Sequence, residues 1–241
     1  MTSGKPKFSI ILPTYNSEKY VLETLESINN QSFKGFELIV VDNESKDSTR
    51  QILKDNQEKY SYQLDTAPNI YKYSYEEPVF KAFEKMNGEW FTIIGSDDVL
   101  EPDYLNNYNK IITRLGTKHK CFQSAIRMFN EDISSISSHT YSNIEQLKEL
   151  YLQKCPVNTP TVFYHNSIRE FFIPKSSEYL GAMDYYVYGN LIDNGIYIYP
   201  IPLFLGYKYR IHSEQATWGM QKLGMDKKIQ DYWREKWTQK T

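Results

Sequence analysis

The chain has 241 residues, 40% of them hydrophobic and 24% charged, which is enough to bury a core of its own. Its formal net charge of −2 argues against a nucleic-acid-binding protein, because such a domain is basic. The two cysteines, Cys121 and Cys155, lie far apart and form no CxxC motif, so the sequence indicates neither a disulfide scaffold nor a zinc site. Residues 1–7 lack the apolar core of a signal peptide, and no stretch approaches the roughly 20 apolar residues that span a bilayer. We therefore expect one compact cytoplasmic unit.

The first hundred residues repeat a pattern of strand and helix. Residues 8–12, 36–41 and 90–94 are short apolar runs that predict buried strands. Helical patterns follow the first two runs, and Pro78 begins a helix that ends before the third. Repeated steps of this kind predict an α/β fold with a mostly parallel central sheet and flanking helices. The first two turns have no glycine-rich phosphate motif, so a nucleotide would be held by side chains and a metal.

The second half of the chain is less regular. Its periodicity predicts strands and helices at 121–129, 144–152, 161–164 and 183–193. Two later runs, 196–201 and 204–209, are apolar and aromatic, but Pro200 and Pro202 interrupt them. Because proline cannot donate to a sheet ladder, these runs are typical of edge strands.

Residues 226–240 predict a helix with a broad apolar face that lysines flank. The face is formed by Met225, Ile229, Tyr232, Trp233 and Trp237. Such a helix either docks on the domain or lies on a membrane surface, and docking is the favoured interpretation.

An acidic turn, Gly95-Ser-Asp-Asp98, follows the strand at 90–94 directly. Ligands of parallel sheets gather beyond the carboxyl ends of the strands, so this turn is a candidate site. Carboxylate oxygens without a neighbouring Cys or His suit Mg²⁺ or Mn²⁺ better than zinc. The alternative is that Asp97 and Asp98 cap the helix expected after Pro102.

Five segments in order, most of them at strand ends, resemble the inverting family-2 glycosyltransferases of GT-A fold. The segments are Pro13-Thr-Tyr-Asn16, Val41-Asp-Asn-Glu-Ser45, Gly95-Ser-Asp-Asp98, the helix headed by Asp184, and Tyr209-Arg-Ile-His212. Each motif alone is a weak signal, whereas five in sequence are specific. The resemblance implies a Rossmann-like GT-A domain over 1–225, with a nucleotide-binding half at about 1–100 and an acceptor-binding half at about 101–225. The amphipathic helix at 226–241 would follow it.

The resemblance implies a nucleotide-sugar donor, usually a UDP-sugar. Pro13, Thr14 and Tyr15 would border the base, Asp42 would hydrogen-bond it, and Ser96 would belong to the same nucleotide site. For Asp42, the alternative is a cap of the following turn.

The resemblance also implies a bound Mn²⁺ or Mg²⁺. The second Asp of the family's Asp-x-Asp signature maps onto Asp97, with Asp98 after it, and the late histidine that completes the ligand set maps onto His212. The first Asp of that signature is replaced by Gly95. A lone histidine is otherwise more often structural.

The family's general base maps onto Asp184, where the usual Gly-Glu-Asp reads Gly181-Ala-Met-Asp. The expected reaction is a direct, inverting transfer of the sugar to a hydroxyl of a glycan or lipid-linked acceptor, in bacterial surface polysaccharide synthesis. The enzyme would be cytoplasmic, with peripheral attachment to the inner face of the membrane if the last helix binds lipid. Two alternatives stay open, a nucleotidyltransferase and a catalytically inert sugar-binding module on the same fold.

Overall fold

The computed structural model describes residues 4–70, 75–116, 118–172 and 182–239. Its strands are β1 Phe8–Thr14, β2 Phe36–Asp42, β3 Gln63–Thr66, β4 Trp90–Ile93, β5 Val99–Leu100, β6 Cys121–Phe129, β7 Ser134–Ser137, β8 Phe163–His165 and β9 Ile198–Arg210. Its α-helices are α1 Val21–Asn29, α2 Thr49–Tyr60, α3 Glu76–Phe83, α4 Tyr104–Leu115, α5 Ile144–Tyr151, α6 Met183–Asp193, α7 Ala216–Lys222 and α8 Met225–Thr238. Two 3₁₀ helices span Thr159–Thr161 and Asn166–Phe172.

The strands form one sheet in the order β3-β2-β1-β4-β8-β6-β9-β5, with β7 paired to β6. Strands β1 to β4 are parallel to one another, and β6 is parallel to β9. The predicted α/β fold with a mostly parallel sheet is therefore confirmed. Strands β5, β7 and β8 join by antiparallel pairing, which the sequence pattern did not predict.

The prediction of two strands near the prolines is wrong in number, because Ile198–Arg210 form the single strand β9, but the edge character predicted around the prolines is confirmed. Strand β9 pairs with β6 along its length, and register shifts beside Ala125 absorb the irregularity. On its other side, β5 pairs only with Tyr207 and Lys208. Pro200 and Pro202 thus lie where that side of β9 carries no partner strand in the described sheet, so they cost no ladder hydrogen bond there.

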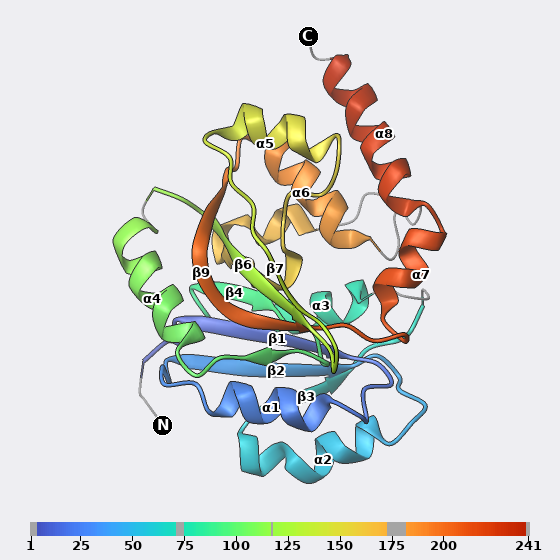
Figure 1. Cartoon of the computed structure of the whole chain (residues 1–241). Helices are drawn as coiled ribbons and strands as arrows, with labels where there is room; N and C mark the ends of the chain where they lie inside the picture. The colour runs from blue at the N-terminus through green and yellow to red at the C-terminus, as the bar shows by residue number, and fades with distance from the viewer. Residues whose placement is uncertain (1–3, 71–74, 117, 173–181, 240–241) are drawn as a thin grey trace.

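The two faces of the sheet bury two apolar layers. Alternate residues of β1 point to opposite faces, so Ile10 and Leu12 pack with α1, α2 and α4, whereas Ile11 packs with α3, α6 and α8. Figure 1 shows α1 and α2 on one side of the sheet and α5, α6 and α8 on the other. Both faces are covered, which explains why the central strands are almost continuously hydrophobic.

Helix α8 docks on the body of the protein through its apolar face. Ile229, Trp233 and Trp237 are buried in the same cluster as the residues of α6. The contact is close at Gly189 of α6, where an added Cβ would lie 2.1 Å from Nε1 of Trp233. The favoured docking interpretation is thus confirmed for this apolar face. No helix in the described ranges is long and apolar enough to cross a bilayer.

The acidic turn does not cap a helix. Helix α4 begins at Tyr104 after Asp103, and the short strand β5 lies between the turn and that helix. Strand β5 pairs antiparallel with the end of β9, which aligns Val99 with Lys208. This pairing carries the chain after β9 back alongside the acidic turn.

Candidate active site

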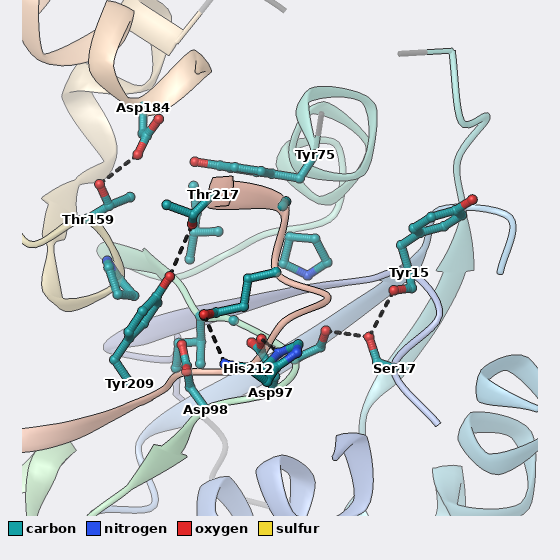
Figure 2. Close-up of a pocket in the computed structure, with 18 of the residues that line it drawn as sticks. Tyr15, Ser17, Tyr75, Asp97, Asp98, Thr159, Asp184, Tyr209, His212 and Thr217 are labelled. Atoms are coloured by element: carbon teal, nitrogen blue, oxygen red, sulfur yellow. Dashed lines mark hydrogen bonds and ion pairs between the residues drawn. The ribbon is translucent and has the colours of Figure 1, made fainter. Parts of the chain in front are cut away.

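A cavity of about 580 Å³ opens at the carboxyl ends of β1 and β4, and the segment after β9 and the start of α6 close it. It holds most of the side chains that the sequence singled out: Pro13, Thr14, Tyr15, Ser96, Asp97, Asp98, Asp184 and His212. Figure 2 shows Tyr15 and Asp184 at opposite ends of this pocket, with Asp97 and His212 between them. The expected nucleotide, metal and base positions therefore share one cavity, except for Asp42.

The carboxylate of Asp97 meets the imidazole of His212, with 2.8 Å between Oδ2 and Nε2. The ring of His212 packs on that of Tyr20, at 5.1 Å between centroids, and its backbone N–H donates to Gln215. Its Nδ1 is buried and has no hydrogen-bond partner within the described part of the chain. Packing and the backbone, rather than a second ring hydrogen bond, therefore set the direction of the imidazole.

The carboxylate of Asp98 is almost fully buried. The hydroxyl of Tyr207 donates to Oδ2 at 2.7 Å, and the backbone N–H of Arg210 donates to Oδ1 at 2.9 Å. Burial, with the nearby charge of Asp97, raises the pKa of Asp98 well above its usual range. Both oxygens of Asp98 thus hold the turn against β9. Of the three predicted metal ligands, this leaves Asp97 and His212 with ligand atoms that face one another. The described residues contain no cluster of three His, Cys, Asp or Glu that could hold a metal by themselves.

Arg210 completes this attachment. Its Nε donates to the backbone carbonyl of Asp97 at 2.8 Å, and its guanidinium pairs with Glu23 and lies over the ring of Tyr20. The Tyr-Arg-x-His segment therefore both carries His212 and fixes the turn that carries Asp97.

Gly95 stands at the first position of the Asp-x-Asp signature, where neighbouring carboxylates crowd the space that a larger side chain would need. A Cβ at Gly95 would lie 2.5 Å from Oδ2 of Asp98 and 2.9 Å from Oδ1 of Asp97. The N–H of Gly95 also donates to the hydroxyl of Tyr207 at 3.1 Å. Because real Cβ contacts are not this short, an Asp at position 95 would require the carboxylates of Asp97 and Asp98 to shift.

The nucleotide end of the cavity is formed by the turns after β1 and β4. Ser17 joins them, because its hydroxyl lies 2.6 Å from that of Ser96. Asn16 adopts a left-handed backbone conformation, and its N–H donates to the hydroxyl of Ser45 in the turn after β2. Three βα turns are thus linked by short polar side chains.

Asp42 lies behind the pocket wall rather than in it. It is fully buried, and Oδ1 accepts hydrogen bonds from the hydroxyls of Thr14 at 3.2 Å and Ser45 at 2.6 Å. The next residue, Asn43, lines the cavity instead. Asp42 therefore orders the following turn, which is the alternative role that its sequence position left open. Its side chain does not reach the part of the cavity expected to bind the nucleotide.

Asp184 is half-buried at the far end of the cavity, in the first turn of α6. Its Oδ2 accepts a hydrogen bond of 2.6 Å from the hydroxyl of Thr159. Burial raises the pKa of Asp184 above the usual value, although the bond from Thr159 and backbone N–H groups oppose the shift. A carboxylate in this setting is a stronger base than one in water.

Several lining residues were missed from the sequence. Ser17, Tyr20, Tyr75, Asn158 and Thr159 all face the cavity. The run Asn158-Thr-Pro-Thr161 before β8 carried a signal, since a cluster of small polar residues beside an apolar strand marks a turn at a strand end. Tyr75 and Tyr20 carried none, because tyrosines are frequent throughout this chain.

The cavity is acidic. Its carboxylates are Asp97, Asp98, Asp184, Glu214 and Asp226. Lys19 is the one Lys or Arg among the described lining residues, and its ammonium pairs with Glu214 at 2.8 Å. An anionic ligand in this cavity would therefore need a cation to accompany it.

Comparison with known proteins places this geometry in a family. Residues 9–178 match the family model described as glycosyl transferase family 2. A stretch of 37 residues is 57% identical to the poly(ribitol-phosphate) beta-N-acetylglucosaminyltransferase TarS of Staphylococcus aureus, which is 14% of this chain and 6% of that protein.

Solved structures show the same fold. The crystal structure of S. aureus TarS 1–349 in complex with UDP-GlcNAc matches with a TM-score of 0.69 and 23% identity, over 88% of this chain and 60% of that chain. The mannosyltransferase PcManGT from Pyrobaculum calidifontis, in complex with GDP-Man and Mn²⁺, matches with a TM-score of 0.64 and 15% identity, over 91% of this chain and 61% of that chain. The chain thus spans about three fifths of each of these two solved chains.

Proposed function

The chain belongs to glycosyl transferase family 2, and we propose that it is a metal-dependent, inverting enzyme that transfers a sugar from a UDP-sugar. The acceptor in this proposal is a hydroxyl group of a glycan or lipid-linked glycan made for the bacterial surface. Because the chain belongs to a glycosyltransferase family, we set the nucleotidyltransferase alternative aside. The crowding around Gly95 explains why no Asp stands there, so Gly95 no longer argues for an inert sugar-binding module.

The observation that carries the proposal is the meeting of Asp97 and His212 in an acidic cavity that also contains Asp184. A nucleotide diphosphate is anionic, and the described lining offers only Lys19, which is already paired. A divalent cation would supply the missing positive charge and stabilise the diphosphate as it leaves.

The donor set fits such an ion. Asp97 offers a carboxylate oxygen and His212 an imidazole nitrogen, and the two atoms lie 2.8 Å apart in a hydrogen bond. A bound ion would take the place of the proton that they share. Mg²⁺ sites in nucleotide enzymes commonly use one or two protein ligands, and substrate phosphates and waters provide the rest. Asp97 and His212 would hold the ion, whereas Asp98 would keep the turn in place.

The reaction we propose is a single displacement. The acceptor oxygen forms a bond to the anomeric carbon while the bond from that carbon to the diphosphate breaks, and UDP leaves with the electron pair. The proton of the acceptor hydroxyl passes to the carboxylate of Asp184. General base catalysis of this kind contributes roughly 10²–10⁴-fold. Attack from the face opposite the leaving group inverts the anomeric configuration.

The UDP-sugar is the preferred donor because TarS, with which the chain shares its fold and a short stretch of high identity, was solved with UDP-GlcNAc. PcManGT, whose identity to this chain is lower, was solved with GDP-Man and Mn²⁺.

A thermal-shift screen tests the proposal. UDP-GlcNAc, UDP-Glc, UDP-Gal and GDP-Man are each added with Mn²⁺, with Mg²⁺ and with EDTA. A ligand at 100 times its Kd stabilises the folded protein by about 2.7 kcal/mol, which is a readily measured shift. We expect stabilisation by UDP-sugars with the metal and little without it. Slow release of UDP from the stabilising donor would then show catalysis, and stabilisation without any release would favour the inert module.

A further inference from the structure

The carboxylate of Asp184 accepts a side-chain hydrogen bond at one of its two oxygens. Oδ2 accepts the 2.6 Å hydrogen bond from the hydroxyl of Thr159, and backbone N–H groups at the start of α6 act on the same carboxylate. No side-chain hydrogen bond to Oδ1 is found among the described residues. Figure 2 shows Asp184 and Thr159 side by side at the end of the cavity, where they come from different segments of the chain.

Thr159 is itself fixed by its neighbour. The N–H of Asn158 donates to the side chain of Gln123 at 2.9 Å, and Nδ2 of Asn158 donates to the carbonyls of Ser124 at 3.1 Å and Ser137 at 3.2 Å. Thr161 closes the turn, because its hydroxyl donates to the carbonyl of Asn158 at 2.8 Å. The strands β6 and β7 therefore determine where the hydroxyl of Thr159 lies.

We propose that Thr159 is a positioning residue for catalysis, which holds Oδ2 of Asp184 so that Oδ1 is the atom that takes the acceptor proton. The inference rests on the proposed function of Asp184 as the base. The hydroxyl has two effects. It fixes the rotation of the carboxylate, and it favours the charged form against the burial that raises the pKa of Asp184. A protonated carboxyl accepts no further proton, so a hydrogen bond that favours the charged form supports Asp184 as a base.

Asp226 in α8 is the titratable group whose charge raises the pKa of Asp184. The charge of Asp184 in turn raises the pKa of six other acids: Tyr75 before α3, Tyr151 in α5, Cys155 after α5, Tyr164 in β8, Tyr188 in α6 and Tyr209 in β9. None of these groups brings a positive charge to the carboxylate. Among the described residues, Thr159 is the side chain that donates a hydrogen bond to the carboxylate of Asp184. A substitution of Thr159 that removes the hydroxyl therefore tests this contribution.

The test is a ¹³C-carboxyl NMR titration of the full chain labelled at aspartate, with the Asp184 signal identified by its absence in Asp184→Asn. Thr159→Val keeps the shape and removes the donor, and Thr159→Ala serves if the valine variant does not fold. We expect the pKa of Asp184 to rise by about one unit, the size of one hydrogen bond to a charged group. Thr159→Ser is the rescue variant, which keeps the hydroxyl and should return the pKa towards that of the wild type.

The acid limb of UDP release should move upward by the same amount, with KM for the donor little changed. An unchanged pKa of Asp184 in Thr159→Val, or a shifted pKa without a matching shift of the acid limb, overturns the inference. Near-normal turnover in Asp184→Asn would overturn the base assignment instead. The two failures are distinguishable because the NMR titration needs no turnover.

Discussion

Nε2 of His212 lies 2.8 Å from Oδ2 of Asp97, although 115 positions separate the two residues in the chain. The antiparallel pairing of β5 with β9 brings them together, and the buried carboxylate of Asp98 fixes that pairing through Tyr207 and Arg210. The pairing of β5 with β9 thus brings a carboxylate and an imidazole, both common metal ligands, together in an acidic cavity. This arrangement is the basis for the proposed metal requirement.

UDP affinity should depend on this pair and on a divalent ion. EDTA is expected to weaken UDP binding strongly in calorimetry, and Asp97→Asn should do the same because it keeps the shape and removes the charge. His212→Ala should have a smaller effect, since water can fill one coordination position. Asp103→Asn, an acid outside the cavity, is the matched control. UDP affinity that survives both chelation and Asp97→Asn would rule out the metal.

Completing the family signature should damage the protein. In Gly95→Asp, the new Cβ would lie 2.5 Å from Oδ2 of Asp98, so either the turn or the buried carboxylate must move. We expect a loss of about 1–3 kcal/mol in the free energy of unfolding, measured by urea denaturation, together with weaker UDP binding. Gly95→Ala should behave similarly, because the Cβ makes the clash. Gly4→Ala, whose Cβ meets nothing within 4 Å, is the control. Wild-type stability in Gly95→Asp would show that our steric account is mistaken.

The fold was predictable where local pattern and packing agree. The strands at 8–12, 36–41 and 90–94 were found because both faces of the sheet are covered, which makes these runs continuously apolar. Strand β7, Ser134–Ser137, lies outside the predicted strands, because only its pairing with β6 makes it a strand. The extent of β9 was missed for a related reason, since a register shift in its partner cannot be seen in its own sequence.

A buried glutamate should make stability depend on pH. Glu76 in α3 is 3% exposed, and burial, aided by the charge of Glu77, raises its pKa to about 7. The folded state then holds a proton that the unfolded chain loses near pH 4.5, so the contribution of Glu76 to stability falls as pH rises from there to about 7.

Glu76→Gln removes that dependence. Its free energy of unfolding should exceed that of the wild type at pH 8 by at most about 3.4 kcal/mol, with a correspondingly higher Tm, and the difference should shrink towards pH 4. Glu58→Gln, at an exposed position of α2, controls for the loss of one charge. Equal Tm differences at pH 8 and pH 4 would contradict the shifted pKa.

The candidate site was predictable in its residue types and less so in their directions. Asp97, Asp98 and Asp42 all lie at strand ends. Of the three, only Asp97 contacts its expected partner, His212. Asp98 and Asp42 instead accept hydrogen bonds that order their own turns. Sequence spacing places a carboxylate at a strand end but does not give the rotamer, which tertiary donors decide. Thr159 lies outside every motif, and only the fold brings it to Asp184.

The turnover of Asp184→Asn tests the central claim most directly. Asn can accept the hydrogen bond from Thr159 and suits a helix start about as well as Asp, so a purely structural residue would tolerate the change. An amide takes no proton, so we predict that kcat for transfer or donor hydrolysis falls by roughly 10² or more, with UDP affinity and Tm close to those of the wild type. Near-normal turnover in Asp184→Asn would contradict the account.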